Sequence, residues 1–286
     1  MTQPLVTIAI SCYNHQDYVV DSLLSALGQS YSNIELLVFD DGSKDQSVAT
    51  ITALQQQHSF YFETQKNIGL NHTLNKALAL AKGKYFVPFG SDDIMLLDRI
   101  EKQVNYMEAH ADIAICAGNI LKIDEHSQIC KKQKFVSTQR QTFDQIYTSK
   151  GADAPAPTLF FRTELVKKCG GFHPDIALED LYIKLKITRE YGDLAVINDL
   201  LSYYRTHPHN TYKNFDYMLN NVLLTYEEFN DHTNYQTVKY SFLNSTLLKA
   251  SKSNPPQARR ILAMIPWRHR NLKTLRAAAR LLTKFK

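Results

Sequence analysis

The stretch Leu5-Val-Thr-Ile-Ala-Ile-Ser11 is short, apolar and rich in β-branched residues, and the polar residues Cys12-Tyr-Asn14 follow it directly. An apolar run of this length is typical of a strand that is buried on both faces of a parallel sheet. Ile34-Glu-Leu-Leu-Val-Phe39 and Tyr85-Phe-Val-Pro-Phe89 have the same character. We expect the three stretches to form strands of one sheet.

Segments with helical spacing alternate with these strands. The spacing of apolar residues predicts helices over residues 18–29, 43–57, 70–81 and 97–110. Ser43 is expected to cap the second helix. Shorter strands are expected over residues 60–63 and 113–117. This alternation predicts an α/β fold with a mainly parallel sheet and helices on both faces.

The rest of the chain is less regular. Residues 119–150 are polar and are expected to contain a strand and a loop. Further on, we expect strands over 158–162 and 200–205, and helices over 164–169 and 178–191. From Tyr212 onward the pattern is helical, which predicts a C-terminal helical extension over residues 211–286 after a domain of residues 1–210.

The composition excludes several classes of protein. Aromatic residues are frequent, with 16 Tyr and 14 Phe, so the chain is not a disordered one. No apolar run approaches the ~20 residues that span a bilayer, and no signal peptide is expected because strand-like sequence follows Pro4 directly. The scattered cysteines predict reduced thiols and a cytoplasmic location.

Charge is distributed unevenly along the chain. The whole sequence has 33 Lys and Arg against 28 Asp and Glu. Residues 232–286 contain 12 of the basic residues and no acidic one, whereas residues 1–231 have 21 basic and 28 acidic residues. An acidic body with a basic tail indicates an anionic surface as the partner of the tail.

Polar residues follow the expected strands. Ser11 and Tyr13-Asn14 end the first strand, Asp40-Asp41 the second, and Asp92-Asp93 the strand that begins at Tyr85. Ligands of an open parallel sheet bind beyond the carboxyl ends of its strands. Carboxylates that gather there favour a hard metal ion with oxygen ligands. Because the G-x-G-x-x-G and G-x-x-x-x-G-K-[ST] loops are missing, a nucleotide would have to bind through metal and side chains.

Four segments together resemble the family 2 inverting glycosyltransferases of GT-A fold. They are Val6-Thr-Ile-Ala-Ile-Ser-Cys-Tyr-Asn14, Leu37-Val-Phe-Asp-Asp-Gly-Ser43, Asn67-Ile-Gly69 with Asn75, and Phe89-Gly-Ser-Asp-Asp93. The order and spacing match over residues 5–98, and Glu179-Asp180 extends the resemblance to about residue 210. The resemblance implies a nucleotide-sugar-binding half over residues 1–118 and an acceptor half over residues 119–210.

The resemblance also implies roles for single residues on the donor side. The donor is a nucleotide diphosphate sugar, usually a uridine diphosphate sugar, bound with Mg²⁺ or Mn²⁺. Asp93 is expected to contact the metal. The residues expected to bind the nucleotide sugar are Ser11, Tyr13, Asn14, Asp41, Asn75 and Asp92.

The remaining implied roles concern the acceptor and the diphosphate. Asp180 resembles the general base of the family, and a carboxylate at a helix N-terminus is stabilised in its ionised form. Glu179 would orient the acceptor or shape the loop. Arg205 would pair with phosphate oxygens, and His207 would touch metal or phosphate. The segment 119–150, with Lys131, Lys132 and Lys134, is either a lid over the donor or a solvated loop.

The C-terminal sequence reads as a basic amphipathic helix. At ~100° per residue, Lys273, Arg276, Arg280 and Lys284 cluster on one side of a helix over residues 271–286. An apolar face lies opposite, made of Leu272, Leu275, Ala279, Leu282 and Phe285. The sequence favours contact of residues 255–286 with an anionic membrane; packing on the catalytic domain is the alternative. No module for nucleic acid is present.

These features predict an enzyme at the inner face of the cell membrane. Its expected acceptor is a glycan or a polyprenyl-diphosphate-linked sugar, in the assembly of a surface polysaccharide such as capsule or O-antigen. Two other hypotheses are a nucleotidyltransferase that uses a similar metal edge, and a non-catalytic membrane adaptor with the same fold. The first lacks a glycine-rich basic loop near the N-terminus, and the second would not need Asp41, Asp92, Asp93 and Asp180 together.

Overall fold

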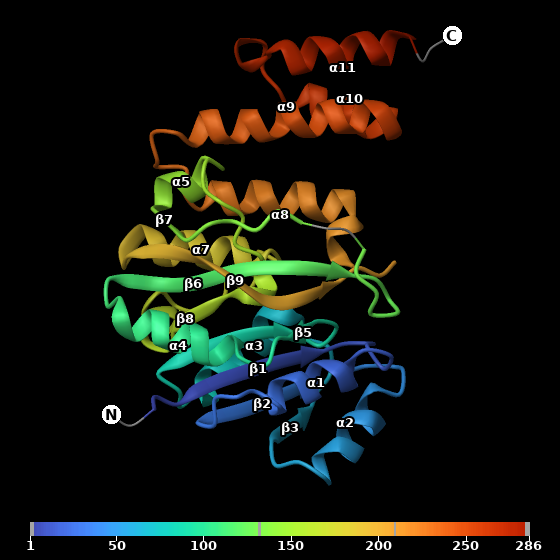
Figure 1. Ribbon diagram of the computed structural model, residues 1–286. Helices are drawn as coiled ribbons and strands as arrows, with labels where there is room; N and C mark the ends of the chain where they lie inside the picture. Colours follow the sequence, from blue (N-terminus) through green and yellow to red (C-terminus); the bar gives the residue numbers. More distant parts are fainter. Residues whose placement is uncertain (1–2, 131–132, 209, 284–286) are drawn as a thin grey trace. The chain divides into compact units, whose positions relative to one another are not determined.

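The computed structural model describes residues 3–130, 133–208 and 210–283. The chain forms two compact units, Met1–Asn210 and Thr211–Lys286 (Figure 1). Lys131 and Lys132 of the expected lid lie outside the described residues, as do Lys284 and Phe285 of the expected basic helix.

The first unit is built on one mixed sheet. Its strands are β1 (Val6–Cys12), β2 (Ile34–Asp40), β3 (Tyr61–Thr64), β4 (Tyr85–Gly90), β5 (Ile94–Met95), β6 (Ile113–Ile123), β7 (Gln139–Gln141), β8 (Phe160–Arg162) and β9 (Asp193–Arg205). Their order is β3-β2-β1-β4-β8-β6-β9-β5, and β7 also pairs with β9. The pairs β1–β2, β1–β4, β2–β3 and β6–β9 are parallel. The short strands β5, β7 and β8 run antiparallel to their neighbours.

Helices cover both faces of this sheet, as the sequence predicted. They are α1 (Val19–Leu27), α2 (Ser47–Gln55), α3 (Leu70–Leu80), α4 (Arg99–Ala109), α5 (Phe143–Tyr147), α6 (Thr163–Lys168) and α7 (Glu179–Glu190), with a 3₁₀ turn η1 (Ala156–Thr158). Buried side chains of α1, α2 and α4 share one apolar cluster, and those of α3, α6 and α7 share another.

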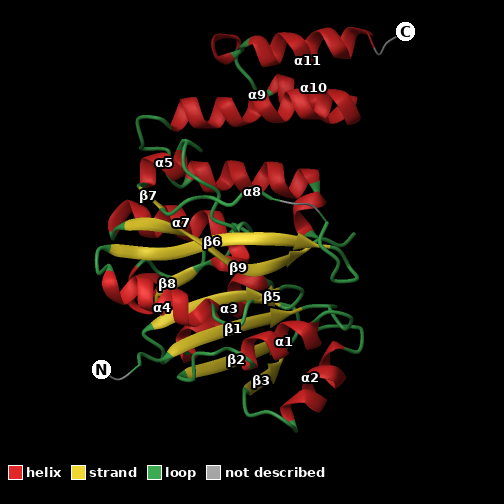
Figure 2. Ribbon diagram, in the orientation of Figure 1, coloured by secondary structure: helices red, strands yellow, loops and turns green. Residues whose placement is uncertain are grey.

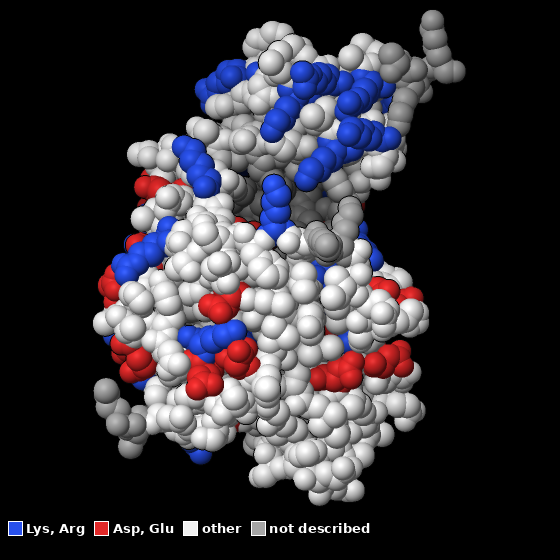
Figure 3. All heavy atoms as spheres, in the orientation of Figure 1, with Lys and Arg blue, Asp and Glu red and all other residues white. Residues whose placement is uncertain are grey.

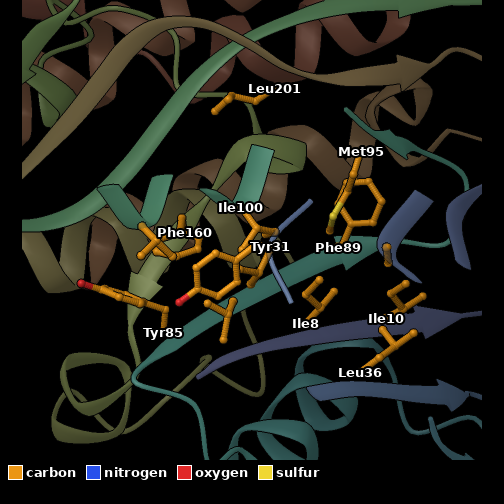
Figure 4. Close-up of a cluster of buried hydrophobic side chains, with 14 of the residues drawn as sticks. Ile8, Ile10, Tyr31, Leu36, Tyr85, Phe89, Met95, Ile100, Phe160 and Leu201 are labelled. Carbon is orange, nitrogen blue, oxygen red and sulfur yellow. The ribbon is translucent and has the colours of Figure 1, made fainter. Parts of the chain in front are cut away.

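The two clusters take alternate side chains of the central strands. Ile8 and Ile10 of β1 belong to the cluster of α1 and α4, whereas Ala9 between them belongs to the cluster of α3 and α7. Figure 4 shows Ile8 and Ile10 beside Phe89 of β4 in the first of these clusters. Strands that are apolar on both sides therefore hold helices on both faces, which is the arrangement expected of the sequence.

Two local expectations are wrong. Ser43 does not cap a helix, because its Oγ accepts a hydrogen bond from the backbone N–H of Asn14 at 2.8 Å and α2 begins only at Ser47. The strand expected over 113–117 continues to Ile123 as β6, since it pairs along nearly its whole length with β9 through irregularities in register near Asn119. Long-range pairing decides both features, and local sequence patterns do not report it.

The second unit is helical. It contains α8 (Phe215–Glu227), α9 (Tyr235–Ser253), α10 (Pro255–Ala263) and α11 (Leu272–Thr283), with 3₁₀ turns η2 (Thr211–Lys213) and η3 (Trp267–His269). Leu243 and Leu247 of α9 form an apolar core with Ile261 of α10 and with Ala277 and Leu281 of α11. The Oγ1 of Thr274 donates a hydrogen bond to Asn244, so α11 is held on α9 by a small-residue face.

We predict that Gly83→Ala destabilises the sheet. A Cβ at Gly83 would lie 2.5 Å from the backbone N of Thr7 and 2.8 Å from the backbone O of Tyr85, and neither atom can move away without separating β1 from β4. Overpacking of this kind costs about 1–3 kcal/mol. Urea unfolding of the two proteins measures this difference.

Gly28→Ala is the matched control. Gly28 has an ordinary φ of −85°, and its added Cβ would meet only the backbone O of Leu24 at 3.1 Å. The control should therefore lose much less stability. Equal stability of the Gly83→Ala variant and the wild type would contradict the prediction.

Candidate active site

The strands bring their carboxyl ends to one edge of the sheet. β1, β2 and β4 are parallel to one another, and β8 lies antiparallel between β4 and β6, so β6 and β9 point the same way as β4. The arrowheads in Figure 2 show this shared direction. The segments that leave this edge include Tyr13–His15, Asp41–Ser43, Ser91–Asp93 and Thr206–His207. We call this edge the carboxyl edge.

At the carboxyl edge, Gly90 allows two carboxylates to fold back over the end of β4. A Cβ on Gly90 would lie 2.7 Å from Oδ1 of Asp92 and 3.3 Å from Oδ2 of Asp93. The Oδ2 of Asp92 lies 3.0 Å from Nε2 of His207, which follows β9. Residues that are more than a hundred positions apart in the sequence therefore meet at this point.

A possible metal site lies here. His15, Asp92 and His207 each offer a ligand atom, and the three atoms lie within 4.8 Å of one another. Nitrogen and carboxylate ligands in such a group are suited to a divalent cation. The residues present thus fit a bound metal. Sequence reasoning named Asp92 and His207 but missed His15, although it directly follows Asn14 in the first motif.

Asp93 occupies a different position from the one expected of a metal ligand. It is buried and does not belong to this group of three. Its Oδ1 accepts a hydrogen bond from the backbone N–H of Arg205 at 2.8 Å. Burial and the charge of Asp92 raise the pKa of Asp93 well above its usual range. Asp92 therefore lies in the possible metal site, and contact of Asp93 with a metal stays a prediction.

The carboxylate of Asp92 is the one of this pair that stays ionised. Burial raises its pKa, but the hydrogen bond with His207 and the charges of His15 and His207 outweigh that effect and lower it. An ionised carboxylate between two imidazoles is the chemical state that metal binding requires.

Arg205 has a structural role at the carboxyl edge. Its side chain is buried and donates from Nε to the backbone O of Asp92 at 2.8 Å and from Nη2 to Asp21 at 3.0 Å. Its Nη1 donates to the turn after β6, including Oγ of Ser127 at 2.9 Å. These partners engage Nε, Nη1 and Nη2 of the guanidinium, and the pairing of Arg205 with phosphate stays a prediction.

Three of the residues expected to bind the nucleotide sugar, Ser11, Tyr13 and Asn14, lie at the end of β1 and in the loop after it. Ser11 is the next-to-last residue of β1, and Tyr13 is 45% exposed, so a nucleobase could reach it. Asn14 has a left-handed φ of 55°, and its Oδ1 accepts a hydrogen bond from the backbone N–H of Lys44 at 2.7 Å. This bond ties the loop after β1 to the loop after β2.

The carboxylate of Asp41 makes hydrogen bonds within the protein that the sequence did not indicate. Its carboxylate accepts hydrogen bonds from the side chain of Gln65 and from the backbone N–H groups of Ile68 and Gly69, each at 2.9 Å. Asp41 is therefore the residue that shapes the loop before α3. Any contact with a nucleotide would have to use the oxygen lone pairs of Asp41 that these three hydrogen bonds leave.

Asn75 is partly buried and is bonded to the segment that precedes α7. Its side chain makes a pair of hydrogen bonds with the backbone of Phe172, one to the O at 2.7 Å and one from the N–H at 2.8 Å. Asn71, one helical turn earlier, donates to the backbone O of Ile176 at 2.7 Å and to that of His173. Both asparagines thus fix the segment that leads into α7. Sequence reasoning missed Asn71, although its spacing from Asn75 places both on one face of a helix.

Glu179 and Asp180 form a second cluster, at the start of α7. The Nζ of Lys184 donates to Oδ2 of Asp180 at 3.0 Å and to the backbone O of Ala154 at 3.0 Å. Burial and the charge of Asp180 raise the pKa of Glu179 to about 8. The carboxyl of Glu179 therefore keeps its proton near neutral pH, while the carboxylate of Asp180 is paired with Lys184.

Comparison with known sequences places these features in a family. Residues 7–170 match the sequence model of glycosyl transferase family 2, which is more than half of the chain. An uncharacterized glycosyltransferase of Haemophilus influenzae is 36% identical over 133 residues, covering 43% of this chain and 53% of that protein. This chain thus spans about half the length of that relative. An uncharacterized glycosyltransferase of Methanocaldococcus jannaschii is 26% identical over 253 residues, covering 78% of this chain and 84% of the relative.

Solved structures have the same fold. Residues 1–349 of TarS from S. aureus, in complex with UDP-GlcNAc, superpose with a TM-score of 0.73 at 17% identity, over 98% of this chain and 89% of that one. The mannosyltransferase PcManGT from Pyrobaculum calidifontis, in complex with GDP-Man and Mn²⁺, gives a TM-score of 0.64 at 18% identity, over 100% of this chain and 80% of that one. The chain therefore has the GT-A fold and belongs to glycosyl transferase family 2, a family of sugar-transferring enzymes.

Proposed function

We propose that the protein transfers a sugar from a nucleotide diphosphate sugar to a hydroxyl of a glycan or lipid-linked glycan. A UDP sugar is the proposed donor, and the transfer inverts the configuration of the anomeric carbon. The observation that carries the proposal is the group of His15, Asp92 and His207 at the carboxyl edge of a family 2 chain. This is the edge at which open α/β sheets bind their ligands.

Asp92 and His207 would hold the divalent metal of this reaction. A metal at this position neutralises the negative charge that grows on the diphosphate leaving group. Ser11 and Tyr13 supply a hydroxyl and an exposed ring for the base and ribose, beside the loop that Asp41 shapes.

Asp180 is proposed as the general base. Lys184 holds its Oδ2, which leaves Oδ1 to accept the proton of the acceptor hydroxyl. Asn71 and Asn75 fix the segment before α7 and so position this carboxylate. The deprotonated hydroxyl attacks opposite the leaving diphosphate, and this single displacement inverts the anomeric configuration. Glu179, protonated near neutral pH, is then a hydrogen-bond donor for the acceptor.

The structures of similar proteins support a nucleotide-sugar donor, but their bound donors differ in the nucleobase. TarS was solved with UDP-GlcNAc, and PcManGT with GDP-Man and Mn²⁺. Membership of family 2 argues against the nucleotidyltransferase hypothesis and against a non-catalytic adaptor.

The C-terminal unit is proposed to hold the enzyme on an anionic membrane, at the inner face of the cell membrane. Among the described residues, no helix combines the length and the apolar content that crossing a bilayer requires. On a helical wheel at ~100° per residue, the surface of α11 divides into three arcs. One arc, of Thr274, Ala277 and Leu281, is buried; a second carries Lys273, Arg276 and Arg280; the third is apolar.

The apolar arc of α11 is exposed, as most of the basic arc is. Leu272 is 70% exposed, Leu275 62% and Leu282 74%, and Trp267 just before the helix is 81% exposed. Figure 3 shows Lys and Arg side chains gathered over the surface of this unit. Apolar and aromatic side chains beside basic ones are typical of a helix that lies in an anionic lipid interface. A lipid-linked acceptor for surface polysaccharide assembly would be available there.

The first prediction concerns Asp180. Asp180→Asn should lower the rate of donor turnover by about 10²–10⁴-fold, because an amide cannot accept the proton. Release of nucleoside diphosphate from UDP-GlcNAc, UDP-glucose and GDP-Man with Mn²⁺ measures the effect. The donor that raises the melting temperature of the wild type should raise that of the variant equally.

Asp175→Asn is the control for charge removal in the same region, since Asp175 is an exposed carboxylate of the loop before α7. It should turn over donor like the wild type. Unchanged turnover by Asp180→Asn would remove Asp180 as the base.

The second prediction concerns pH. The carboxyl of Glu179 titrates near 4.5 in the unfolded chain and at about 8 in the folded one. The folded chain therefore keeps a proton that the unfolded chain releases, and the stabilisation present below pH 4.5 is lost as the pH rises toward 8. Glu179→Gln should flatten this decline in thermal or urea unfolding between pH 5 and pH 8.

Glu164→Gln, at an exposed position of α6, should leave the pH dependence as it is in the wild type. If the Glu179→Gln curve runs parallel to that of the wild type, the raised pKa is not a property of the folded protein.

The third prediction concerns the membrane. The full chain should sediment with vesicles that contain phosphatidylglycerol and not with neutral phosphatidylcholine vesicles, and added salt should weaken binding. Replacing Leu272, Leu275 and Leu282 together by Gln should abolish sedimentation, since the apolar arc is lost while the charges stay. Leu97→Gln, at a leucine that is 66% exposed elsewhere, is the control. Undiminished binding by the triple variant would refute membrane docking through α11.

A further inference from the structure

His15 is held in place from several sides. It lies in the loop between β1 and α1, and its backbone N–H donates to Oγ of Ser47 at 3.0 Å. Its ring Nδ1 lies 2.7 Å from Oγ of Ser91, the residue before Asp92. The ring packs edge-on against His207, with centroids 5.5 Å apart. An imidazole fixed in this way has a defined direction in which its other nitrogen can act.

We propose that His15 is a direct metal ligand, and that the set of two histidines and one aspartate selects a transition-metal ion such as Mn²⁺ over Mg²⁺. The biological meaning of this selection rests on the proposed function, because the metal would serve the donor diphosphate. The binding of the metal itself can be tested without any donor.

The spacing of the three side chains suits one shared ion. Metal–nitrogen and metal–oxygen bonds of about 2.0–2.2 Å put the ligand atoms of one ion within roughly 4.4 Å of one another. The ligand atoms of His15, Asp92 and His207 lie within 4.8 Å. A small adjustment of side chains is therefore enough to bring all three to a common ion.

The chemistry of the set disfavours Mg²⁺. Magnesium takes oxygen ligands and keeps several of its waters, whereas imidazole nitrogen suits transition metals. With two imidazoles among three protein ligands, the site gives Mg²⁺ only one favoured partner, Asp92. A six-coordinate ion held by three protein ligands also keeps positions for diphosphate oxygens or water.

The surroundings of the set have the character of a built site. Nδ1 of His15 lies 2.7 Å from Oγ of Ser91. In the tautomer in which Nδ1–H donates to this oxygen, Nε2 has the lone pair that a metal needs, and metal-ligating histidines generally have an outer-shell contact of this kind. On the other side, Arg205 holds the backbone O of Asp92, and Oδ1 of Asn210 accepts from the backbone N–H of His207 at 2.6 Å.

The test uses the metal-stripped full chain without nucleotide. Isothermal titration gives the dissociation constants of Mn²⁺ and, by competition, of Mg²⁺. We expect Mn²⁺ to bind more tightly than Mg²⁺ in the wild type, and His15→Asn to weaken Mn²⁺ by at least about tenfold. His15→Asp, which replaces nitrogen by oxygen, should narrow the preference for Mn²⁺ by improving Mg²⁺ binding relative to Mn²⁺.

His72→Asn is the matched control, because His72 is an exposed histidine of α3. It should bind both metals like the wild type. Unchanged Mn²⁺ affinity in His15→Asn, or an equal Mn²⁺ to Mg²⁺ ratio in all variants, would overturn the proposal.

A measurement on the wild type keeps the proposal testable even if the variants fold poorly. Pulsed electron paramagnetic resonance of bound Mn²⁺ detects coordinated imidazole nitrogen, and we expect two imidazoles. A single imidazole would overturn the proposed set of two histidines and one aspartate. The metal proposal and the proposed function can be refuted independently. If no donor is turned over, the proposed function is refuted but the metal-binding data remain valid. If only one imidazole is detected, the metal proposal is refuted but the turnover data remain valid.

Discussion

The buried guanidinium of Arg205 is the contact on which the carboxyl edge depends. It joins the end of β4 through Asp92, the turn after β6 through Ser127, and α1 through Asp21. A buried cation is tolerated only when its donors are satisfied, so the loops that carry these acceptors must keep their positions. Asp92 and His207 meet because the strands before them run parallel and because this one side chain fixes where their loops go.

Sequence patterns predicted the strands, most helices and the edge at which the polar residues gather, because apolar periodicity is a local signal. They could not predict which polar groups would pair across the fold. Ser43 bonds Asn14, Asn75 bonds Phe172, and His15 bonds Ser91, and each of these contacts depends on the tertiary arrangement. The motifs thus located the polar edge of the sheet, whereas the different surroundings of Asp92 and Asp93 could be described only from coordinates.

The C-terminal unit shows the same limit. The sequence indicated a basic helix with an apolar side, but a helical wheel does not say which side packs. In α11 the small residues Thr274 and Ala277 allow close approach to α9, and the larger leucines stay outside. The helix therefore keeps an apolar surface after the unit has formed its own core.

Helix α3 has a consequence for how such an enzyme can change. Its first turn is bound to Asp41 in the proposed nucleotide pocket through Gly69, and Asn71 and Asn75 bind the segment that carries the proposed base. Helix α3 thus connects the proposed nucleotide pocket to the segment that precedes the proposed base. If Asp41 and Asp180 have their proposed roles, substitutions that reshape the donor pocket near Asp41 would also displace the base, and donor preference and turnover would change together in evolution or by engineering.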